Sequence, residues 1–156
     1  MREQIDNFVP RSITLQGRIQ IAAPANAAFR MFSPLGEKLW VPGWDPELLY
    51  PANSTWQEGL IFRTREETGD AVWIVSQLDM SAYRVTYYRL EPTRYAVRVE
   101  VRCNPITDEL TEAVTEYSFV GLSHDGNDAI AAITQDSYDA KMARWANWID
   151  MCLQSL

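Results

Sequence analysis

The chain has 156 residues, of which 47% are hydrophobic and 22% charged, and it carries a formal net charge of −7. This length and composition are typical of one folded domain spanning residues 1–156 rather than of a disordered segment. The negative charge disfavours a nucleic-acid partner, and no apolar run reaches the ~20 residues that a helix needs to cross a bilayer.

Residues 1–11 predict an irregular lead-in to the domain. The lead-in contains charged residues but no apolar core, so it is not expected to be a secretory signal. Cys103 and Cys152 lie far apart in the sequence and fit reduced thiols better than a disulfide. We therefore expect a cytoplasmic protein.

The first regular elements are a strand and two short helices. From Ser12 to Ala22 apolar and polar residues alternate, which predicts a half-buried strand. Pro24 is favoured in the first turn of a helix, so a short helix is expected to follow it. Ser33-Pro34 ends that helix and begins a second over Leu35 to Leu39. The next stretch, Trp40 to Pro46, is rich in turn-forming residues and cannot continue the helix.

A run of strands follows, with no interruption long enough for a helix. The expected strands are Trp56 to Arg65, Ala71 to Leu78, Tyr83 to Leu90, Arg94 to Cys103 and Leu110 to Leu122. Turn-forming residues separate them at short intervals. Parallel strands would need crossover connections of a dozen residues or more, so the sheet is predicted to be antiparallel.

The last two of these strands permit a register to be proposed from the alternation alone. If the valines of the first pair with the inner residues of the second, Arg98 falls opposite Glu116 and Arg102 opposite Glu112. Each such surface pair contributes only a few tenths of a kcal/mol, so its value would lie in fixing the register.

The final part of the chain, Asp128 to Leu156, predicts one long helix. Its apolar residues recur at steps of three and four and share one stripe: Tyr138, Met142, Trp145, Ile149, Cys152 and Leu156. Asn127 or Asp125 is expected to cap its start. At about 1.5 Å per residue the helix would be about 40 Å long, which is enough for a whole sheet to wrap around it.

The order of these elements and several local motifs resemble a known fold. The motifs are Ala23-Pro24, Phe29 to Phe32, Pro34 to Trp40, Pro42-Gly43-Trp44, Pro46, Glu58-Gly59 with Phe62, Trp73-Ile74-Val75, Tyr117 and Met142 to Trp145. They resemble the helix-grip fold of the START-like superfamily, also called SRPBCC, which includes polyketide cyclases and dehydratases, pathogenesis-related plant allergens, lipid-transfer domains and activators of the Hsp90 ATPase. The resemblance implies an α+β fold: a curved antiparallel sheet of about six or seven strands wrapped around a long C-terminal helix, with two short helices after the first strand.

The same resemblance implies a mostly apolar cavity between the concave face of the sheet and the last helix. The residues expected to line it are Trp40, Trp44, Phe62, Thr64, Trp73, Val75, Val85, Tyr87, Val99, Thr115, Tyr117, Met142 and Trp145, with Glu37 near the mouth. Aromatic walls favour a flat ligand over a straight acyl chain, and the hydroxyl groups can orient it. The alternative is that these bulky side chains fill the interior and leave little space.

Residues that carry chemistry are few. His124 is the only histidine, and with two distant cysteines no metal site and no cofactor is expected. No nucleophile elbow or phosphate-binding glycine motif occurs. Glu37, close to Trp40, is the best acid–base candidate, because lost solvation raises the pKa of a carboxyl group; Tyr87 and Tyr117 are the other candidates. Glu37 could instead cap backbone groups or pair with an arginine.

Three functions are compatible with this sequence. The first is binding of a small hydrophobic molecule, aromatic or polyketide-like, in the cavity. The second is a cyclase, dehydratase or hydrolase acting on such a molecule, with Glu37, Tyr87 or Tyr117 moving protons. The third is a protein-partner role like that of the Hsp90-activating relatives. Binding is preferred, because no strong catalytic constellation accompanies the aromatic residues.

Overall fold

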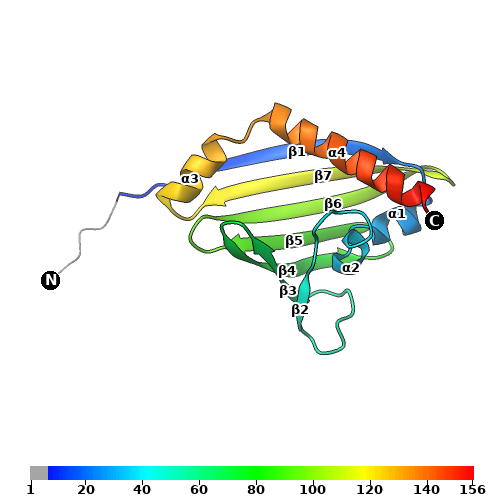
Figure 1. The fold of residues 1–156 in the computed structure, drawn as a ribbon, viewed down its shortest axis with the longest axis horizontal. Helices are drawn as coiled ribbons and strands as arrows, with labels where there is room; N and C mark the ends of the chain where they lie inside the picture. Colours follow the sequence, from blue (N-terminus) through cyan, green and yellow to red (C-terminus); the bar gives the residue numbers. More distant parts are fainter. Residues whose placement is uncertain (1–6) are drawn as a thin grey trace.

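One antiparallel sheet organises the molecule. The computed structural model describes residues 7–156, so the first part of the predicted lead-in lies outside the described residues. The strands are β1 (Ser12–Ile21), β2 (Glu47–Tyr50), β3 (Ile61–Glu66), β4 (Gly69–Asp79), β5 (Arg84–Glu91), β6 (Tyr95–Thr107) and β7 (Leu110–Gly121). They form a seven-stranded sheet in the order β1-β7-β6-β5-β4-β3-β2, with every neighbouring pair antiparallel (Figure 1).

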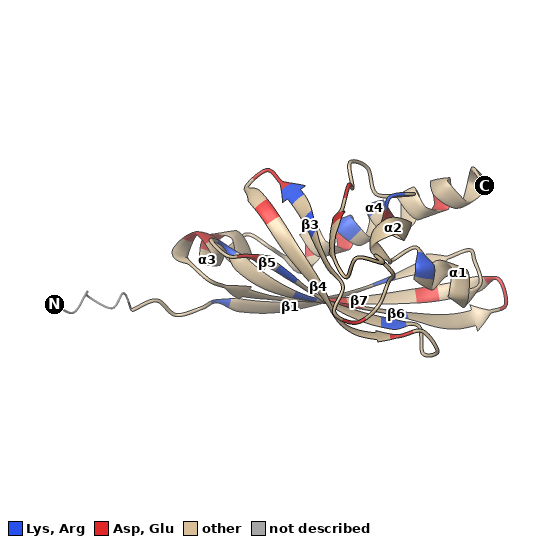
Figure 2. Ribbon diagram, turned by 90° about the horizontal axis from the view of Figure 1, so that it is seen from below, with Lys and Arg blue, Asp and Glu red and all other residues tan. Residues whose placement is uncertain are grey.

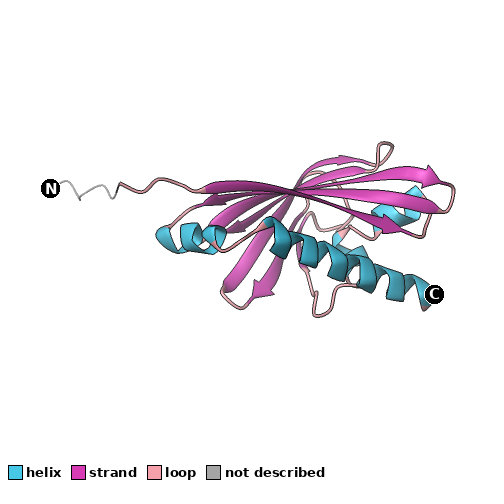
Figure 3. Ribbon diagram, turned by 90° about the horizontal axis from the view of Figure 1, so that it is seen from above, coloured by secondary structure: helices cyan, strands magenta, loops and turns pink. Residues whose placement is uncertain are grey.

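Four helices accompany the sheet within the described residues. They are α1 (Ala25–Arg30), α2 (Pro34–Glu37), α3 (His124–Ala131) and α4 (Gln135–Gln154). The last two run along the same side of the sheet, as Figure 3 shows. A curved antiparallel sheet, two short helices after the first strand and a long terminal helix together confirm the predicted α+β helix-grip fold.

The prediction of one helix from Asp128 to Leu156 was wrong, because the chain breaks between α3 and α4. Thr134 accepts a hydrogen bond from the backbone N–H of Ser137, and the Ser137 hydroxyl in turn accepts one from the backbone N–H of Thr134. This reciprocal cap starts a new helix at that point. The first helix is capped by Ser123, whose hydroxyl accepts from the N–H of Gly126 at 3.0 Å, and not by Asn127 or Asp125.

Asn127 has a different role, which is to hold the described part of the lead-in. Its side-chain oxygen accepts from the backbone N–H of Arg11 at 2.8 Å, and its amide nitrogen donates to the carbonyl of Val9 at 2.9 Å. Residues 7–11 form no regular element. An irregular lead-in is therefore fixed to the start of α3 by one amide side chain.

The strands show the alternation of inward and outward residues that predicted the sheet. The proposed register between β6 and β7, however, was wrong by two residues. Arg98 lies opposite Ser118, and Arg102 lies opposite Val114. A shift by two keeps every side chain on its own face, so alternation cannot distinguish the two registers. The irregularity near Pro105 and the tight turn that follows set the register instead. Figure 2 shows charged residues of both signs along the strands of this sheet.

Two smaller differences from the sequence prediction lie near the β2 edge of the sheet. The short strand β2 falls between the turn-rich stretch ending at Pro46 and the strand predicted from Trp56, where the sequence predicted no element, and an ion pair of 3.0 Å between Glu47 and Arg63 joins it to β3. The strand predicted from Trp56 begins only at Ile61. Trp56 instead packs its ring 4.9 Å from that of Phe29.

Helix α4 lies directly on β1 because Gly17 has no side chain. A Cβ atom at this position would lie 2.6 Å from Cγ of Met142 and 2.9 Å from Cε1 of Tyr138. Both of these residues belong to the predicted stripe, and both are buried together with Trp145 and Ile149. The stripe therefore seats the helix as predicted, although Leu156 at its end is exposed.

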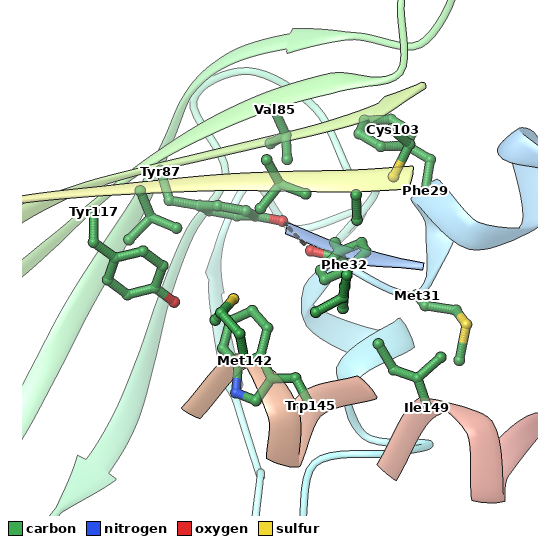
Figure 4. Packing of buried hydrophobic residues seen from close by; sticks show 14 of the residues in the cluster. Phe29, Met31, Phe32, Val85, Tyr87, Cys103, Tyr117, Met142, Trp145 and Ile149 are labelled. Carbon is green, nitrogen blue, oxygen red and sulfur yellow. Dashed lines mark hydrogen bonds between the residues drawn. The ribbon is translucent and has the colours of Figure 1, made fainter. Parts of the chain in front are cut away.

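The interior is tightly packed toward the end where α1 lies. Phe29, Phe32 and Val85 have no exposed surface, and Ile149 of α4 has almost none. Figure 4 shows these side chains meeting between the sheet and α4. Packing of this kind leaves no room for a ligand, so any cavity must lie toward the opposite end.

Candidate functional site

A cavity of about 350 Å³ opens between the inner face of the sheet and α4. Every strand from β3 to β7 contributes to its wall, and the remaining wall comes from α2, the loop after it, the connection between α3 and α4, and α4 itself. The lining residues are Pro34, Glu37, Val41, Trp44, Phe62, Glu66, Trp73, Tyr87, Arg89, Tyr95, Val99, Val101, Tyr117, Phe119, Ile133, Lys141 and Trp145. The space is therefore enclosed by side chains that lie far apart in the sequence.

Aromatic rings make up the wall formed by β3, β4 and the loop after α2. Phe62 and Trp73 stack with their planes at 10° and their centroids 5.5 Å apart. Trp44 meets Trp73 edge-on at 5.6 Å, and its indole N–H donates to the carbonyl of Pro34 at 2.8 Å, which fixes the loop. Rings held in this way form a fixed aromatic wall, which suits edge-to-face contact with an aromatic ligand.

Lys141 projects from α4 into this aromatic surrounding. Its Nζ lies 3.9 Å from the ring centroid of Tyr117 and 5.0 Å from that of Trp145. Among residues 7–156 no carboxylate lies within 4.0 Å of this nitrogen, and no acceptor forms a hydrogen bond with it. Burial, reinforced by the positive charge of Arg89, lowers the pKa of Lys141 to about 7.

Glu37 is the last residue of α2 and faces the same cavity. The helix is placed by Pro34 in its first turn and by the Ser33 hydroxyl, which accepts from the N–H of Gly36 at 2.9 Å. In the described part of the chain, the Glu37 carboxyl group forms no hydrogen bond or ion pair, so neither a backbone cap nor an arginine partner is present. Burial raises its pKa to about 8, and the positive charge of Lys141 partly opposes this rise.

Arg89 is also in the wall, but its charge is balanced. Its guanidinium lies 3.3 Å from a carboxylate oxygen of Glu66 and 3.0 Å from one of Glu91, and it is stacked 5.5 Å from the ring of Trp73. A guanidinium held by two carboxylates and a ring face has little freedom to move. Arg89 therefore acts as a fixed part of the wall.

The two candidate tyrosines differ in their surroundings. Tyr87 donates its hydroxyl hydrogen to the carbonyl of Phe32 at 2.7 Å (Figure 4). It also accepts a hydrogen bond from the indole N–H of Trp56 at 3.1 Å. Within residues 7–156, the hydroxyl of Tyr117 has no such partner. Burial holds the pKa of both phenols well above the usual value, and the charge of Glu37 adds to the effect. Both phenols therefore remain protonated near neutral pH.

The structure separates the residues expected to line the cavity into two groups. Those that line it are Trp44, Phe62, Trp73, Tyr87, Val99, Tyr117 and Trp145, together with Glu37. Those buried beside it are Trp40, Thr64, Val75, Val85, Thr115 and Met142. Each polar member of the second group is occupied: Thr64 accepts from the indole of Trp73 at 3.0 Å, and the Thr115 hydroxyl bonds to that of Tyr138.

Sequence reasoning missed the charged residues of the wall, although the spacing contained the signal. Lys141 follows Tyr138 by three positions and precedes Trp145 by four, so it borders the apolar stripe of the helix. Arg89 follows Tyr87 by two positions and so faces the same side of its strand. Lys141 was assigned to the solvent face of the helix because of its polarity, and Arg89 was assigned to neither face of its strand.

A second hollow, an open groove of about 740 Å³, adjoins the cavity. It is formed by residues 41–47 and by 63–66 of β3, and it shares Val41, Trp44 and Glu66 with the cavity wall. These shared residues place the groove at the entrance. We take the enclosed cavity as the candidate site, because the rings and the two unpaired ionisable groups face into it.

The sheet and the long terminal helix have the arrangement of a helix-grip fold. No protein-family model and no curated protein matches the sequence. Solved structures do match the fold. Norcoclaurine synthase from Thalictrum flavum is 13% identical with a TM-score of 0.69, and the match covers 96% of this chain and 99% of that one.

Two further structures show how widely the fold is shared. Ara h 8.0201 is 12% identical with a TM-score of 0.67, covering 92% of this chain and 99% of that one. The Zhui aromatase/cyclase from Streptomyces sp. R1128 is 18% identical with a TM-score of 0.56, covering 91% and 88%. At these identities the likeness establishes the fold, and the activity must be argued from the cavity itself.

Two absences complete the description of residues 7–156. No helix there is long and apolar enough to cross a membrane. The same residues contain no group of three or more histidine, cysteine, aspartate or glutamate side chains arranged to hold a metal ion.

Proposed function

We propose that the protein binds a small, flat hydrophobic molecule, aromatic or polyketide-like, in the cavity between the sheet and α4. The observation that carries this proposal is the cavity of about 350 Å³ walled by the rings of Phe62, Trp73, Tyr117 and Trp145. Its volume lies at the lower end of the range for small-molecule sites. The stacked pair of Phe62 and Trp73 supplies ring edges that can contact the face of a ligand ring.

The solved structures of the same fold support the choice of ligand class. A structure of norcoclaurine synthase is described as a complex with dopamine and hydroxybenzaldehyde, both of which are small aromatic compounds. Another neighbour is an aromatase/cyclase. The free thiols of Cys103 and Cys152 support a reducing, cytoplasmic setting for the same role in this protein.

Filling the cavity tests the proposal. Val99→Trp places a large ring in the wall, and we expect it to weaken binding of 2-methylnaphthalene at least tenfold in calorimetric titration. Val120→Trp is the matched control, because Val120 lies on the same sheet but is 40% exposed. Equal affinity of both variants and the parent, with all three folded, would place the ligand elsewhere and overturn the proposal.

An enzymatic role is the second candidate, and Glu37 is the observation that favours it. A carboxyl group with a pKa near 8 holds a proton at neutral pH and can release it to a bound molecule. Cyclisation or dehydration of a polyketide-like substrate needs such a group. Turnover that is lost in Glu37→Gln while ligand affinity persists would establish this role; a variant with unchanged turnover would exclude Glu37 from it.

A further inference from the structure

Lys141 is an unusual lysine in this molecule. The sequence contains two lysines, and the other, Lys38, is exposed and lies 3.8 Å from the carboxylate of Asp45. Lys141 has no carboxylate within that distance in the described chain and rests on the rings of Tyr117 and Trp145. An ammonium group without a carboxylate partner is costly to hold away from water, so the site favours the neutral amine.

The charged groups around Lys141 come from several elements. Arg89 of β5 and Arg144 of α4 favour the neutral amine, whereas Glu37 of α2 favours the charged form. With a pKa of about 7, roughly half of the Lys141 side chains carry a free amine at neutral pH, whereas an ordinary lysine is almost entirely protonated. A free amine is a nucleophile, and a protonated one is not.

Glu37 supplies the complementary group. Its carboxyl group faces the same cavity, interacts electrostatically with Lys141 and has no hydrogen-bond partner within residues 7–156. An amine, a carboxylic acid and aromatic walls therefore share one enclosed space. These are the groups that reversible condensation of an amine with an aromatic carbonyl compound requires.

We propose that Lys141 forms an imine with the carbonyl group of an aromatic aldehyde or ketone bound in the cavity, and that Glu37 provides the proton for this step. This inference rests on the proposed function, since the carbonyl compound must first occupy the cavity. It narrows the ligand class from aromatic molecules in general to those that bear a reactive carbonyl group.

The chemistry balances without any further reactant. The neutral amine attacks the carbonyl carbon, so a C–N bond forms and the C=O double bond becomes a single bond. The nitrogen then loses a proton and the oxygen gains one, which gives a carbinolamine. Glu37 then donates its proton to the carbinolamine hydroxyl, the C–O bond breaks, and water leaves. The nitrogen lone pair completes the C=N bond, and the resulting iminium is paired with the Glu37 carboxylate. Addition of water reverses each step and releases the ligand.

Reductive trapping tests the proposal directly. The protein is incubated at pH 7 with limiting 2-naphthaldehyde and sodium cyanoborohydride, and the labelled residue is identified by peptide mass mapping. We expect Lys141 to be labelled at least tenfold more than Lys38 or the N-terminal amine. Equal labelling of Lys38 and Lys141 would overturn the proposal.

Two variants assign the roles of the amine and the acid. Lys141→Arg keeps the positive charge but cannot form an imine, so its labelling at this position should disappear while Lys38 labelling is unchanged. Glu37→Gln should slow labelling of Lys141 at least tenfold. An unchanged rate in Glu37→Gln would remove Glu37 from the mechanism.

A ligand without a carbonyl group separates this inference from the proposed function. Calorimetric titration with 2-methylnaphthalene measures occupation of the cavity alone. If this compound binds and the aldehyde does not label Lys141, the imine is wrong and the binding role stands. If neither occurs, both proposals are wrong.

Discussion

The two ends of the interior use similar residues for different purposes. At the packed end, Phe29, Phe32 and Val85 are completely buried between α1, the sheet and α4. At the open end, Trp73, Tyr117 and Trp145 keep a small exposed fraction and surround the cavity. An aromatic residue on the inner face of the sheet therefore does not by itself indicate a ligand site.

What distinguishes the open end is the mixture of rings with charged groups. Glu37, Glu66, Arg89 and Lys141 all line the cavity. Buried charge is costly and is normally paired, yet two of these four groups have no hydrogen bond or ion pair in the described residues. A part of the interior that retains unpaired ionisable groups is suited to contact with a bound molecule.

Removal of a ring from each end should give the largest difference. The ring centroid of Phe32 lies 5.7 Å from that of Trp40 in tightly packed surroundings. Phe32→Ala creates a cavity there and is expected to lower the free energy of unfolding by about 3–5 kcal/mol. Phe119→Ala at the open end should cost about 1–3 kcal/mol, because one side of its ring already faces empty space. Urea denaturation followed by circular dichroism measures both values, and equal losses would contradict the distinction.

The two ends share α4, so lifting this helix from β1 should disturb both. Gly17→Ala places a Cβ atom within 2.6 Å of Met142 and 2.9 Å of Tyr138, and we expect a loss of about 2 kcal/mol. Gly59→Ala is not a suitable control, because Gly59 has a positive φ of 85°. Gln20→Ala on the outer face of the same strand is a suitable control, and it should change stability by less than about 0.5 kcal/mol. Similar values for the two variants would show that the helix is seated elsewhere.

Deleting one hydroxyl at a time should distinguish Tyr87, whose hydroxyl is hydrogen-bonded within the described part of the chain, from Tyr117, whose hydroxyl is not. Tyr87→Phe leaves the carbonyl of Phe32 without its donor and is expected to cost about 1–2 kcal/mol. Tyr117→Phe removes a hydroxyl that has no hydrogen bond within residues 7–156, so its stability should stay within about 0.5 kcal/mol of the parent. Thermal unfolding monitored by calorimetry gives both numbers. A larger loss for Tyr117→Phe would reverse the assignment.

The sequence predicted the sheet well because alternation is a local property. Each strand's inner face, such as Phe62 and Thr64 of β3, could be assigned from two-residue spacing alone. The break at Thr134 was missed because the apolar stripe begins only after it, although the Thr134 to Ser137 spacing is a capping signal. The register of β7 depends on a turn and an irregularity that alternation does not encode.

The cavity could be predicted less well, for a physical reason. Whether Val85 and Val99 face packed atoms or empty space depends on how closely α1 and α4 approach the sheet, and no local pattern determines that distance. Lys141 was missed because polarity was given more weight than position, and Arg89 was assigned to neither face of its strand. A charged residue that shares a face with aromatic residues is therefore a better indicator of the open end than the aromatic residues themselves.

The charge of Glu37 should make the stability of the open end depend on pH. The folded protein raises the pKa of this group from 4.5 to about 8, so the folded state binds its proton more tightly than the unfolded state does. The stability that this proton contributes is present below pH 4.5 and is lost as the pH rises through 8. Glu37→Gln cannot lose a proton and should therefore be more stable than the parent at pH 8, by up to about 4 kcal/mol, with the difference vanishing near pH 4.5.

Urea denaturation at intervals between pH 4.5 and 9 measures this dependence. The phenols of Tyr87 and Tyr117 stay protonated over this range, so the difference between the two curves reports on Glu37 together with its coupling to Lys141. Glu109→Gln, in the exposed turn between β6 and β7, is the matched control and should show no trend of comparable size. If the curves for Glu37→Gln and the parent are parallel, the carboxyl group is hydrated at the open end, and its use as a proton donor in the cavity loses its physical basis.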